Sequence, residues 1–444
     1  METKPSDRKK IIIIGAAGRD FHNFNTCYRD DARFHVVAFT AAQIPDIDGR
    51  RYPAGLAGPH YPEGIPIHTQ SELPELIRKH DVDTCAFSYS DISYQEVMGI
   101  ASVVNAAGAG FLLPGPRQTM ISSIKPVIAV CAVRTGCGKS QTSRRIIELL
   151  MNMGMKVAAV RHPMPYGDIA SQKVQRYAVL EDLKKHKCTI EEMEEYEPHI
   201  VRGNVIYAGV DYEAILREAE KEADVIIWDG GNNDLPFYKP DLMVTVTDPH
   251  RVGHELSYYP GETALRMADI VVINKIDSSG PDQIHQLRQN ILAVNPEARV
   301  VDAASPLSVD YPERIRGKRV LVVEDGPTLT HGQMKIGAGT VAARKFGAAE
   351  CIDPRPWAKG KIKETFATYP DTGALLPAMG YGEQQIRDLE ATIRATDCDA
   401  VVIGTPIDLT RIISISQPVV KVGYELQEIG RPTLGDLLAD FFGR

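Results

Sequence analysis

The fold of this chain is decided by the stretch Val127-Ile128-Ala129-Val130-Cys131-Ala132-Val133-Arg134-Thr135-Gly136-Cys137-Gly138-Lys139-Ser140. A β-branched apolar run ends here in a glycine loop that closes on Gly-Lys-Ser, and a helical pattern follows at once. The backbone N–H groups of such a loop surround phosphates, the lysine reaches the β and γ oxygens, and the Ser140 hydroxyl can hold Mg²⁺. The stretch therefore predicts a P-loop for a nucleoside triphosphate, which is bound by Thr135, Gly136, Cys137, Gly138, Lys139, Ser140 and Gln141.

The loop departs from the usual P-loop pattern, because Val133 stands where that pattern has its first glycine. It is more similar to the variant loop of the Min and nitrogenase-iron-protein class, in which a basic residue precedes Gly-Gly-x-Gly-Lys-Ser/Thr. Arg134 takes the basic place, and Thr135 departs from the first glycine of the variant. In that class the basic residue contacts a phosphate, often across a dimer interface. The resemblance implies that Arg134 acts as an arginine finger, in its own subunit or in its partner's.

Two later strands end in residues that a P-loop domain needs. The run Asp224–Trp228 is followed by Asp229, which we expect to be the carboxylate on the Mg²⁺ side of the site, opposite Ser140. The run Ile270–Ile273 is followed by Asn274-Lys275-Ile276-Asp277, and Asn-Lys-x-Asp is the guanine-reading element of GTPases. The nucleotide is GTP if Asp277 reads the base, and ATP if the loop serves an adenine instead.

Length and composition restrict the remaining possibilities. A chain of 444 residues with 43% hydrophobic and 24% charged residues is typical of a globular protein with two to three domains. The net charge of -8 argues against nucleic acid as a partner. The 7 cysteines show no C-x-x-C pair and no zinc-ligand spacing, which favours reduced thiols. Without a leader-like segment or an apolar run of about 20 residues, we expect a cytoplasmic protein that does not enter the membrane.

Alternating strand and helix patterns predict an α/β fold with parallel sheets and three parts. Residues 1–124 are expected to form a Rossmann-like domain, 125–310 the P-loop domain, and 311–444 a C-terminal α/β section packed on it. The first domain has a glycine turn, Gly15-Ala16-Ala17-Gly18, with Arg19 and His22 beside it. Its second strand ends in Thr40 rather than in an acid for a ribose, so NAD is not expected. A phosphate at the helix start and a purely structural turn both remain open.

Basic residues mark where an anionic substrate is expected. Arg161 and His162 follow a strand where a switch region would face the γ-phosphate, and Arg251 and His254 follow the strand 243–248. The third section repeats a strand, glycine loop and helix, and free backbone N–H groups at a helix start bind anions. This second loop contributes His331, Lys335, Gly337 and Gly339. The charged run Glu181–Glu197 is expected to be a solvated helix without chemistry.

The chain as a whole resembles cyclic 2,3-diphosphoglycerate synthetase. Besides the P-loop, three stretches carry the resemblance: Val160-Arg161-His162-Pro163-Met164-Pro165-Tyr166-Gly167-Asp168, Asp248-Pro249-His250-Arg251-Val252-Gly253-His254-Glu255 and Glu324-Asp325-Gly326-Pro327-Thr328. The resemblance implies a homodimeric, Mg²⁺-requiring ligase in which ATP closes a phosphoanhydride between the two phosphates of 2,3-diphosphoglycerate, with release of ADP and phosphate. It also makes ATP the expected nucleotide.

These considerations give a set of expected roles. Catalysis is assigned to Lys139, Arg134, Asp229, Arg161 and His162, and Mg²⁺ binding to Ser140 and Asp229. Substrate binding is assigned to Arg251, His254, His331, Lys335, Gly337 and Gly339. The alternative is a GTPase-type switch or a metallochaperone-like regulator, which Asn274, Lys275 and Asp277 favour. Against that alternative, the sequence has no segment rich in histidine or cysteine.

Overall fold

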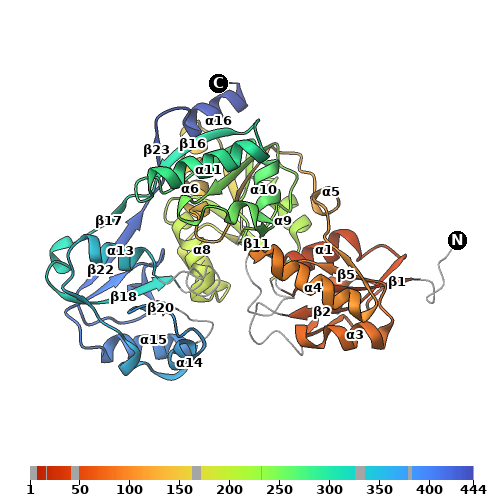
Figure 1. The fold of residues 1–444 in the computed structure, drawn as a ribbon, viewed down its shortest axis with the longest axis horizontal. Helices are drawn as coiled ribbons and strands as arrows, with labels where there is room; N and C mark the ends of the chain where they lie inside the picture. Colours follow the sequence, from red (N-terminus) through yellow and green to blue (C-terminus); the bar gives the residue numbers. More distant parts are fainter. Residues whose placement is uncertain are drawn as a thin grey trace.

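The computed structural model describes residues 8–16, 18–41, 50–162, 172–231, 233–325, 336–378 and 383–443. These residues form three α/β domains, each with its own sheet, and Figure 1 shows the domain around the P-loop between the other two. Parallel strands dominate each sheet, so the predicted α/β class is confirmed. No helix in the described part of the chain is long and apolar enough to cross a membrane.

The N-terminal domain, orange-red in Figure 1, has a sheet with the strand order β3-β4-β2-β1-β5-β7. Its strands are β1 (Lys9–Ile14), β2 (Phe34–Ala41), β3 (Arg51–Tyr52), β4 (Ile65–Thr69), β5 (Thr84–Phe87), β6 (Ile92–Ser93) and β7 (Gly110–Leu112). Its helices are α1 (Arg19–Cys27), α2 (Ala54–Ala57), α3 (Leu73–His80), α4 (Tyr94–Ala107) and α5 (Pro116–Thr119). The apolar run of β1 is central and fully buried, because helices cover both faces of a parallel sheet.

The P-loop domain is built on a sheet with the order β10-β11-β9-β12-β8-β13-β15-β16-β23. Its strands are β8 (Val127–Ala132), β9 (Val157–Val160), β10 (Val174–Tyr177), β11 (Val205–Gly209), β12 (Val225–Trp228), β13 (Leu242–Thr247), β14 (Tyr258–Tyr259), β15 (Ile270–Ile273), β16 (Arg299–Ala304) and β23 (Gln427–Ile429). Its helices are α6 (Lys139–Asn152), α7 (Leu180–Lys185), α8 (Ile190–Ile200), α9 (Tyr212–Ala219), α10 (Gly261–Met267), α11 (Pro281–Val294) and α16 (Leu434–Phe442). Because β8, β9, β12, β13 and β15 are parallel, the loops that follow them open at one sheet edge.

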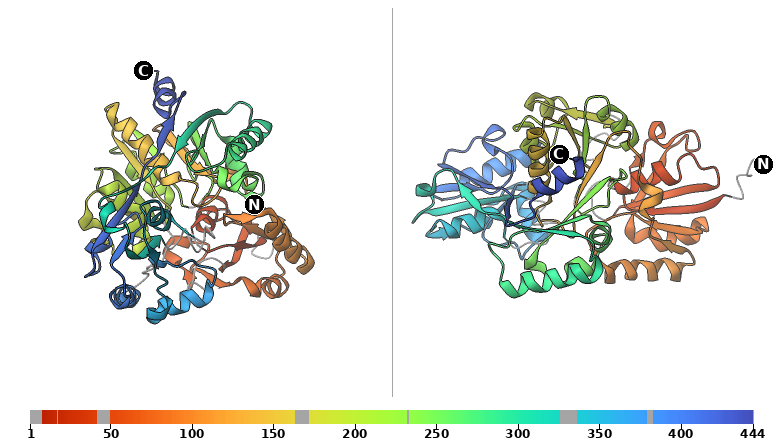
Figure 2. Two further views of the ribbon diagram at one scale, coloured as in Figure 1. Left: turned by 60° about the vertical axis from the view of Figure 1, so that its left-hand side comes forward. Right: turned by 90° about the horizontal axis from the view of Figure 1, so that it is seen from above.

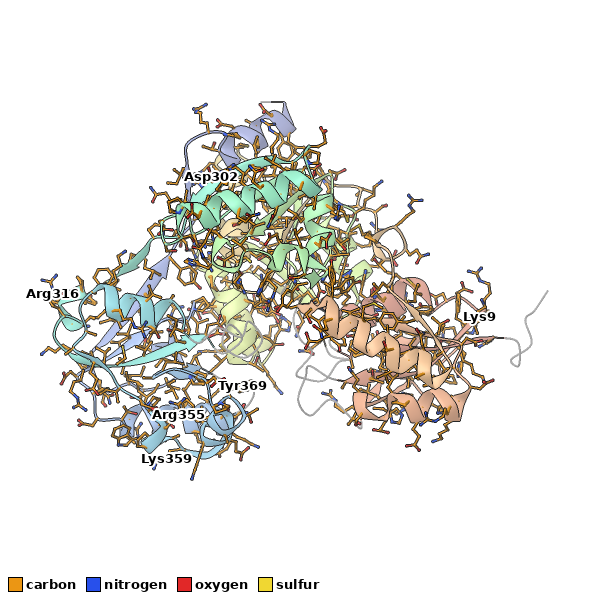
Figure 3. The ribbon with its side chains drawn as sticks, in the orientation of Figure 1. Lys9, Asp302, Arg316, Arg355, Lys359 and Tyr369 are labelled. Atoms are coloured by element: carbon orange, nitrogen blue, oxygen red, sulfur yellow. The ribbon has the colours of Figure 1, made fainter. Side chains whose placement is uncertain are left out.

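The C-terminal domain, blue in Figure 1, has the order β17-β22-β21-β18-β19, with β20 pairing with β18. Its strands are β17 (Leu307–Val309), β18 (Arg319–Asp325), β19 (Glu350–Cys351), β20 (Leu376–Ala378), β21 (Ala400–Ile403) and β22 (Val419–Tyr424). Its helices are α13 (Ala338–Lys345), α14 (Gly360–Thr368) and α15 (Glu383–Ala395). Figure 3 shows Arg316, Arg355 and Lys359 on this domain, away from Asp302 of the P-loop domain and Lys9 of the N-terminal domain.

A two-stranded antiparallel ribbon, the connecting ribbon, joins the C-terminal domain to the P-loop domain. One strand runs through β16 and β17 and the other through β22 and β23, with β23 paired to β16 and β22 paired to β17. Helix α16 then packs on α6, and Leu434, Leu437 and Leu438 join the core of the P-loop domain. The last elements of the predicted section 311–444, β23 and α16, therefore belong to the P-loop domain, as Figures 1 and 2 also show.

The contacts between the N-terminal domain and the P-loop domain include a strand pair and a ring stack. Strand β6 pairs with β14 of the P-loop domain. In addition, the buried His22 ring of α1 stacks on Phe237 with ring centroids 3.9 Å apart, and its Nε2 donates to the carbonyl of Thr119. The start of α1 is occupied by Asp20, whose Oδ1 accepts from the N–H of Gly18 and of Phe21. The structural role of this glycine turn is thus visible, and a phosphate there would meet the Asp20 carboxylate.

Candidate active site

The P-loop connects the central strand β8 to helix α6. Gly136 and Gly138 have φ of 83° and 108°, a backbone region that side chains disfavour. A Cβ on Gly138 would lie 2.1 Å from Nδ2 of Asn274 and 2.6 Å from Nε2 of Gln141. The loop thus needs glycine for its turn, and also because Asn274 and Gln141 approach its backbone closely. Lys139 opens α6 and is buried.

Asp229, at the end of β12, is the centre of a buried charge network. Nζ of Lys139 donates to Oδ1 of Asp229 at 2.7 Å, and Ser143 Oγ donates to the same oxygen at 2.6 Å. Oδ2 accepts from NH1 of Arg161 at 2.8 Å, and Nε2 of His199 lies 3.3 Å away from it. The structure thus brings Lys139, Asp229 and Arg161 together, as a phosphoryl-transfer site requires.

The charged groups of this network shift one another's pKa values. Burial alone would raise the pKa of Asp229, but Arg161, Lys139 and His199 outweigh burial and hold that pKa well below its usual range. Burial, together with Arg161, lowers the pKa of Lys139. For Arg161, burial is outweighed by the carboxylates of Asp229 and Glu195, which raise its pKa. Asp229 and Arg161 are therefore held as an ion pair.

Helix α8 contributes residues that local sequence patterns did not single out. His199 is 1% exposed, and burial lowers its pKa although Asp229 opposes this. Glu195 pairs with NH2 of Arg161 at 2.9 Å, and Glu197 pairs with Arg411 of the C-terminal domain at 3.0 Å. The interpretation of this charged run as a solvated helix holds for α7, where Glu181, Lys184 and Lys185 are exposed. It is wrong for α8, whose glutamates pair with arginines of two domains.

Arg134 is held by the N-terminal domain. Its Nε donates to Oδ1 of Asp91 at 2.5 Å, its NH1 lies 2.7 Å from Nδ1 of His254, and its guanidinium carbon lies 3.6 Å from the ring centroid of Tyr258. Asp91 also accepts from the N–H of Thr135 at 3.4 Å. The side chains of Arg134 and Asp91 are 3% and 5% exposed. That Arg134 acts as an arginine finger stays a prediction. The orientation of its side chain is set by Asp91 of the N-terminal domain.

Arg251 lies beside the P-loop. Its NH2 donates to Oδ2 of Asp248 at 3.1 Å and contacts Sγ of Cys137 at 3.3 Å. Burial raises the pKa of the Cys137 thiol to about 11, although Arg251 lowers it. The predicted substrate residues Arg251 and His254 thus lie beside the loop, and their contact with substrate stays a prediction.

The Asn-Lys-x-Asp segment is built against the P-loop. Nδ2 of Asn274 donates to the carbonyl of Cys137 at 2.9 Å, and Nζ of Lys275 donates to the carbonyl of Gly136 at 2.7 Å. The exposed Asp277 accepts from the N–H of Ser305 at 3.0 Å. Asn274 and Lys275 therefore shape the loop, and Asp277 is the residue of this segment that remains accessible to a base.

The remaining predicted residues divide between two places. Nδ1 of His162 lies 3.3 Å from Oδ2 of Asp234, and its Nε2 faces Gly18, where a Cβ would lie at 1.8 Å. His162 thus packs against the N-terminal domain, next to Arg161 in the chain. In the C-terminal domain, Glu324 accepts from the N–H of Gly337 at 3.1 Å and from the N–H of Gly339 at 3.0 Å.

The start of α13, where the sequence predicts anion binding, is thus occupied by the carboxylate of Glu324. The N–H of Thr340 donates to it as well, at 2.6 Å. Burial raises the pKa of Glu324 although these N–H groups lower it. A substrate anion would have to displace this carboxylate from Gly337 and Gly339. The predicted His331 and Lys335 lie outside the described residues.

The residues around the loop fit a nucleotide with Mg²⁺. The half-buried Ser140 follows Lys139 at the start of α6, and Asp229 offers a carboxylate held in its charged form. These are the residues that would hold Mg²⁺, which supplies charge neutralisation for phosphoryl transfer. No group of three or more His, Cys, Asp or Glu side chains within the described ranges is placed to hold a metal alone. A site of this kind can transfer a phosphoryl group in buried surroundings.

Comparison with known proteins finds a similarity along nearly the whole chain. The arginine synthetase ArcE of Thermococcus kodakarensis is 61% identical over 434 residues, which cover 98% of this chain and 97% of that protein. The cyclic 2,3-diphosphoglycerate synthetase of Thermococcus sibiricus is 27% identical over 114 residues, which are 25% of this chain and 26% of that protein. No protein-family model matches the chain. Among solved structures, LpxK from Aquifex aeolicus in complex with ATP is similar with a TM-score of 0.45 and 13% identity, covering 79% of this chain and 96% of that chain.

Proposed function

The chain belongs to the family of the arginine synthetase ArcE, and on that premise we propose that it is an ATP-dependent ligase that makes arginine. The full-length similarity carries this proposal. The P-loop and the Asp229 network support it, because a synthetase needs a site where a nucleotide gives up a phosphoryl group.

The chemistry of phosphoryl transfer narrows down the bond that is made. Phosphorylation turns an oxygen into a leaving group, so in arginine it serves to form a bond from the guanidinium carbon to a nitrogen. The precursor must carry an oxygen on that carbon, as the ureido amino acid citrulline does. Its ureido oxygen attacks the γ-phosphorus of ATP and ADP leaves. Ammonia then attacks the carbon, phosphate leaves with the oxygen, and a proton is released.

The described residues suit the first of these steps. Lys139 and the loop N–H groups would hold the β- and γ-phosphates, and Arg161 would neutralise charge that develops on the transferred group. Asp229 and Glu195 keep Arg161 in place through its two ends. The buried network excludes water, which protects a phosphorylated intermediate from hydrolysis.

Ring closure of 2,3-diphosphoglycerate is the competing function. The resemblance noted from the sequence holds at the level of a synthetase family, and the similarity to the cyclic 2,3-diphosphoglycerate synthetases covers a quarter of this chain or less. Both reactions begin with transfer of the γ-phosphoryl group to an oxygen of a small acceptor. The predicted substrate, homodimer and cytoplasmic location all stay predictions.

One experiment tests both functions. The purified protein is incubated with ATP and Mg²⁺, together with either citrulline and ammonium or 2,3-diphosphoglycerate. We expect arginine, ADP and phosphate in equal amounts from the first mixture, measured by amino-acid chromatography and ³¹P NMR. A cyclic phosphoanhydride resonance from the second mixture, without arginine from the first, would reverse the assignment. The Lys139→Ala variant serves as the control for contaminating enzymes.

A further inference from the structure

A buried cation that no described residue pairs with lies where the P-loop domain meets the C-terminal domain. Arg144 is in the second turn of α6 and is 8% exposed. Among the residues that the structure describes, its guanidinium makes no hydrogen bond and no ion pair, and its Nε is buried. The neighbouring Arg145, by contrast, is paired with Glu428 at 3.0 Å. This contact places α6 beside the connecting ribbon.

The charges around Arg144 are already engaged elsewhere. Burial lowers the pKa of Arg144, and the groups that act on it are Tyr424, Glu425, Arg202 and Asp229. Glu425 is paired with Arg202, and Asp229 already holds two other cations. An isolated charge in a protein interior costs several kcal/mol, so buried arginines are normally paired. Since no described residue pairs with Arg144, this side chain is placed to bind an anion that a ligand supplies.

Groups of the opposite charge gather at the same junction. Glu194 of α8 is 7% exposed, and Asp325 stands at the end of β18. Burial, together with Asp325 and Glu194, raises the pKa of the Tyr424 phenol to about 12, although Arg144 lowers it, so these charges lie near one tyrosine. A buried guanidinium is complementary to a carboxylate. In an amino-acid substrate, that group is the α-carboxylate.

The junction adjoins the phosphoryl-transfer network. Ser143, which precedes Arg144 in α6, donates to Asp229 at 2.6 Å. Burial lowers the pKa of His199, Asp229 raises it and Arg144 lowers it, so His199 lies near both the network and Arg144. A molecule anchored at Arg144 would thus extend from the C-terminal domain toward the residues that would hold the γ-phosphate.

We propose that Arg144 binds the α-carboxylate of the amino-acid substrate. This proposal rests on the proposed synthesis of arginine. Arginine side chains hold a carboxylate by two parallel charge-assisted hydrogen bonds, which gives both affinity and orientation. The C-terminal domain thereby becomes the acceptor side of the enzyme and the P-loop the donor side.

The test compares arginine with agmatine, which is arginine without its carboxylate. Dissociation constants of both are measured by calorimetry for the wild-type protein and for Arg144→Met. We expect the wild-type protein to bind arginine at least about tenfold more tightly than agmatine, as loss of a charge-assisted pair implies. In Arg144→Met the two ligands should bind equally, whereas the KM for ATP should change by less than about twofold.

A stability measurement separates this role from a structural one. Because Arg144 is buried without a partner, Arg144→Met should leave the ligand-free protein as stable as the wild type or more stable. A structural arginine would behave in the opposite way. Arg145→Met is the matched control on the same helix, and it should lower stability slightly without changing the preference for arginine over agmatine.

The outcomes are distinguishable. Unchanged preference for arginine in Arg144→Met would overturn the carboxylate contact and leave the arginine synthetase function standing. A raised KM for ATP with unchanged arginine affinity would assign Arg144 to the transferred phosphate instead. If the wild-type protein binds neither arginine nor citrulline and makes no arginine, the proposed function fails, and the inference falls with it.

Discussion

Nζ of Lys139 lies 2.7 Å from Oδ1 of Asp229, so the P-loop lysine is paired with the acid at the end of the neighbouring strand. The same carboxylate holds Arg161 and the hydroxyl of Ser143. One acid therefore keeps two cations in place where phosphoryl transfer is proposed.

Lys139→Ala should abolish turnover without unfolding the protein. Asp229 keeps Arg161 and His199 as partners in this variant, so its charge remains compensated. We expect kcat to fall at least about a thousandfold, because the lysine stabilises charge on the transferred group. Circular dichroism and thermal unfolding check the fold. Substantial activity in a folded variant would refute the P-loop assignment.

Arg134→Met should affect both the rate and the stability. The substitution leaves the buried Asp91 carboxylate without its cation, which typically costs about 3–5 kcal/mol of folding free energy. Turnover should fall severalfold or more if Arg134 contacts the γ-phosphate. Adding Asp91→Asn to this variant should restore most of the stability and none of the rate. Recovery of the rate in the double variant would make Arg134 a residue of domain docking alone.

Acid should lower the folding stability of the protein through His22, which lies where the N-terminal domain contacts the P-loop domain. Burial lowers the pKa of His22 from 6.5 to about 3, so the folded protein keeps this ring neutral while the unfolded chain protonates it below pH 6.5. Stability from the neutral ring is complete above pH 6.5 and is lost toward pH 3, by about 1.4 kcal/mol per pH unit. Urea unfolding at pH 7.5 and 4.5 should show a loss about 2.5 kcal/mol larger in the wild type than in His22→Gln. Equal losses would show that His22 does not titrate with unfolding.

Base selection should depend on Asp277 in a nucleotide-specific way. Guanine presents an N1–H and an exocyclic amine to a carboxylate, and adenine lacks the N1–H. We expect Asp277→Ala to weaken GTP binding about tenfold and ATP binding less than about threefold, measured by competition for a fluorescent nucleotide. The N–H of Ser305 donates to Asp277, and in the variant Ser305 should stay in position because it belongs to the connecting ribbon. An equal loss for both nucleotides would mean that Asp277 acts only on the loop.

The nucleotide half of the site could be predicted from the sequence because its residues occur in short contiguous motifs. The glycine loop, Asp229 and the Asn-Lys-x-Asp segment each follow a strand, and parallel strands bring such segments to one sheet edge. The α/β class followed from the same alternation of strands and helices.

The partners that complete the site come from long-range packing, which no local pattern encodes. Asp91 meets Arg134 across 43 residues and from another domain. The glutamates of α8 were predicted to face solvent because charged helices usually do. Here their charges are matched by Arg161 and Arg411, so the same composition marks a helix buried between domains.

The connecting ribbon has a consequence for how this protein is assembled from parts. Ala304 and Gln427 are register partners across β16 and β23, so the chain leaves and re-enters the nucleotide domain at adjacent points. A hairpin turn of about two residues is enough to connect two antiparallel strands that are paired in this way. The intervening segment is therefore inserted between two adjacent points of the sheet, and its exchange for another would leave the paired strands β16 and β23 in place. A replacement would also have to cover α8, whose Glu197 pairs with Arg411 of this segment.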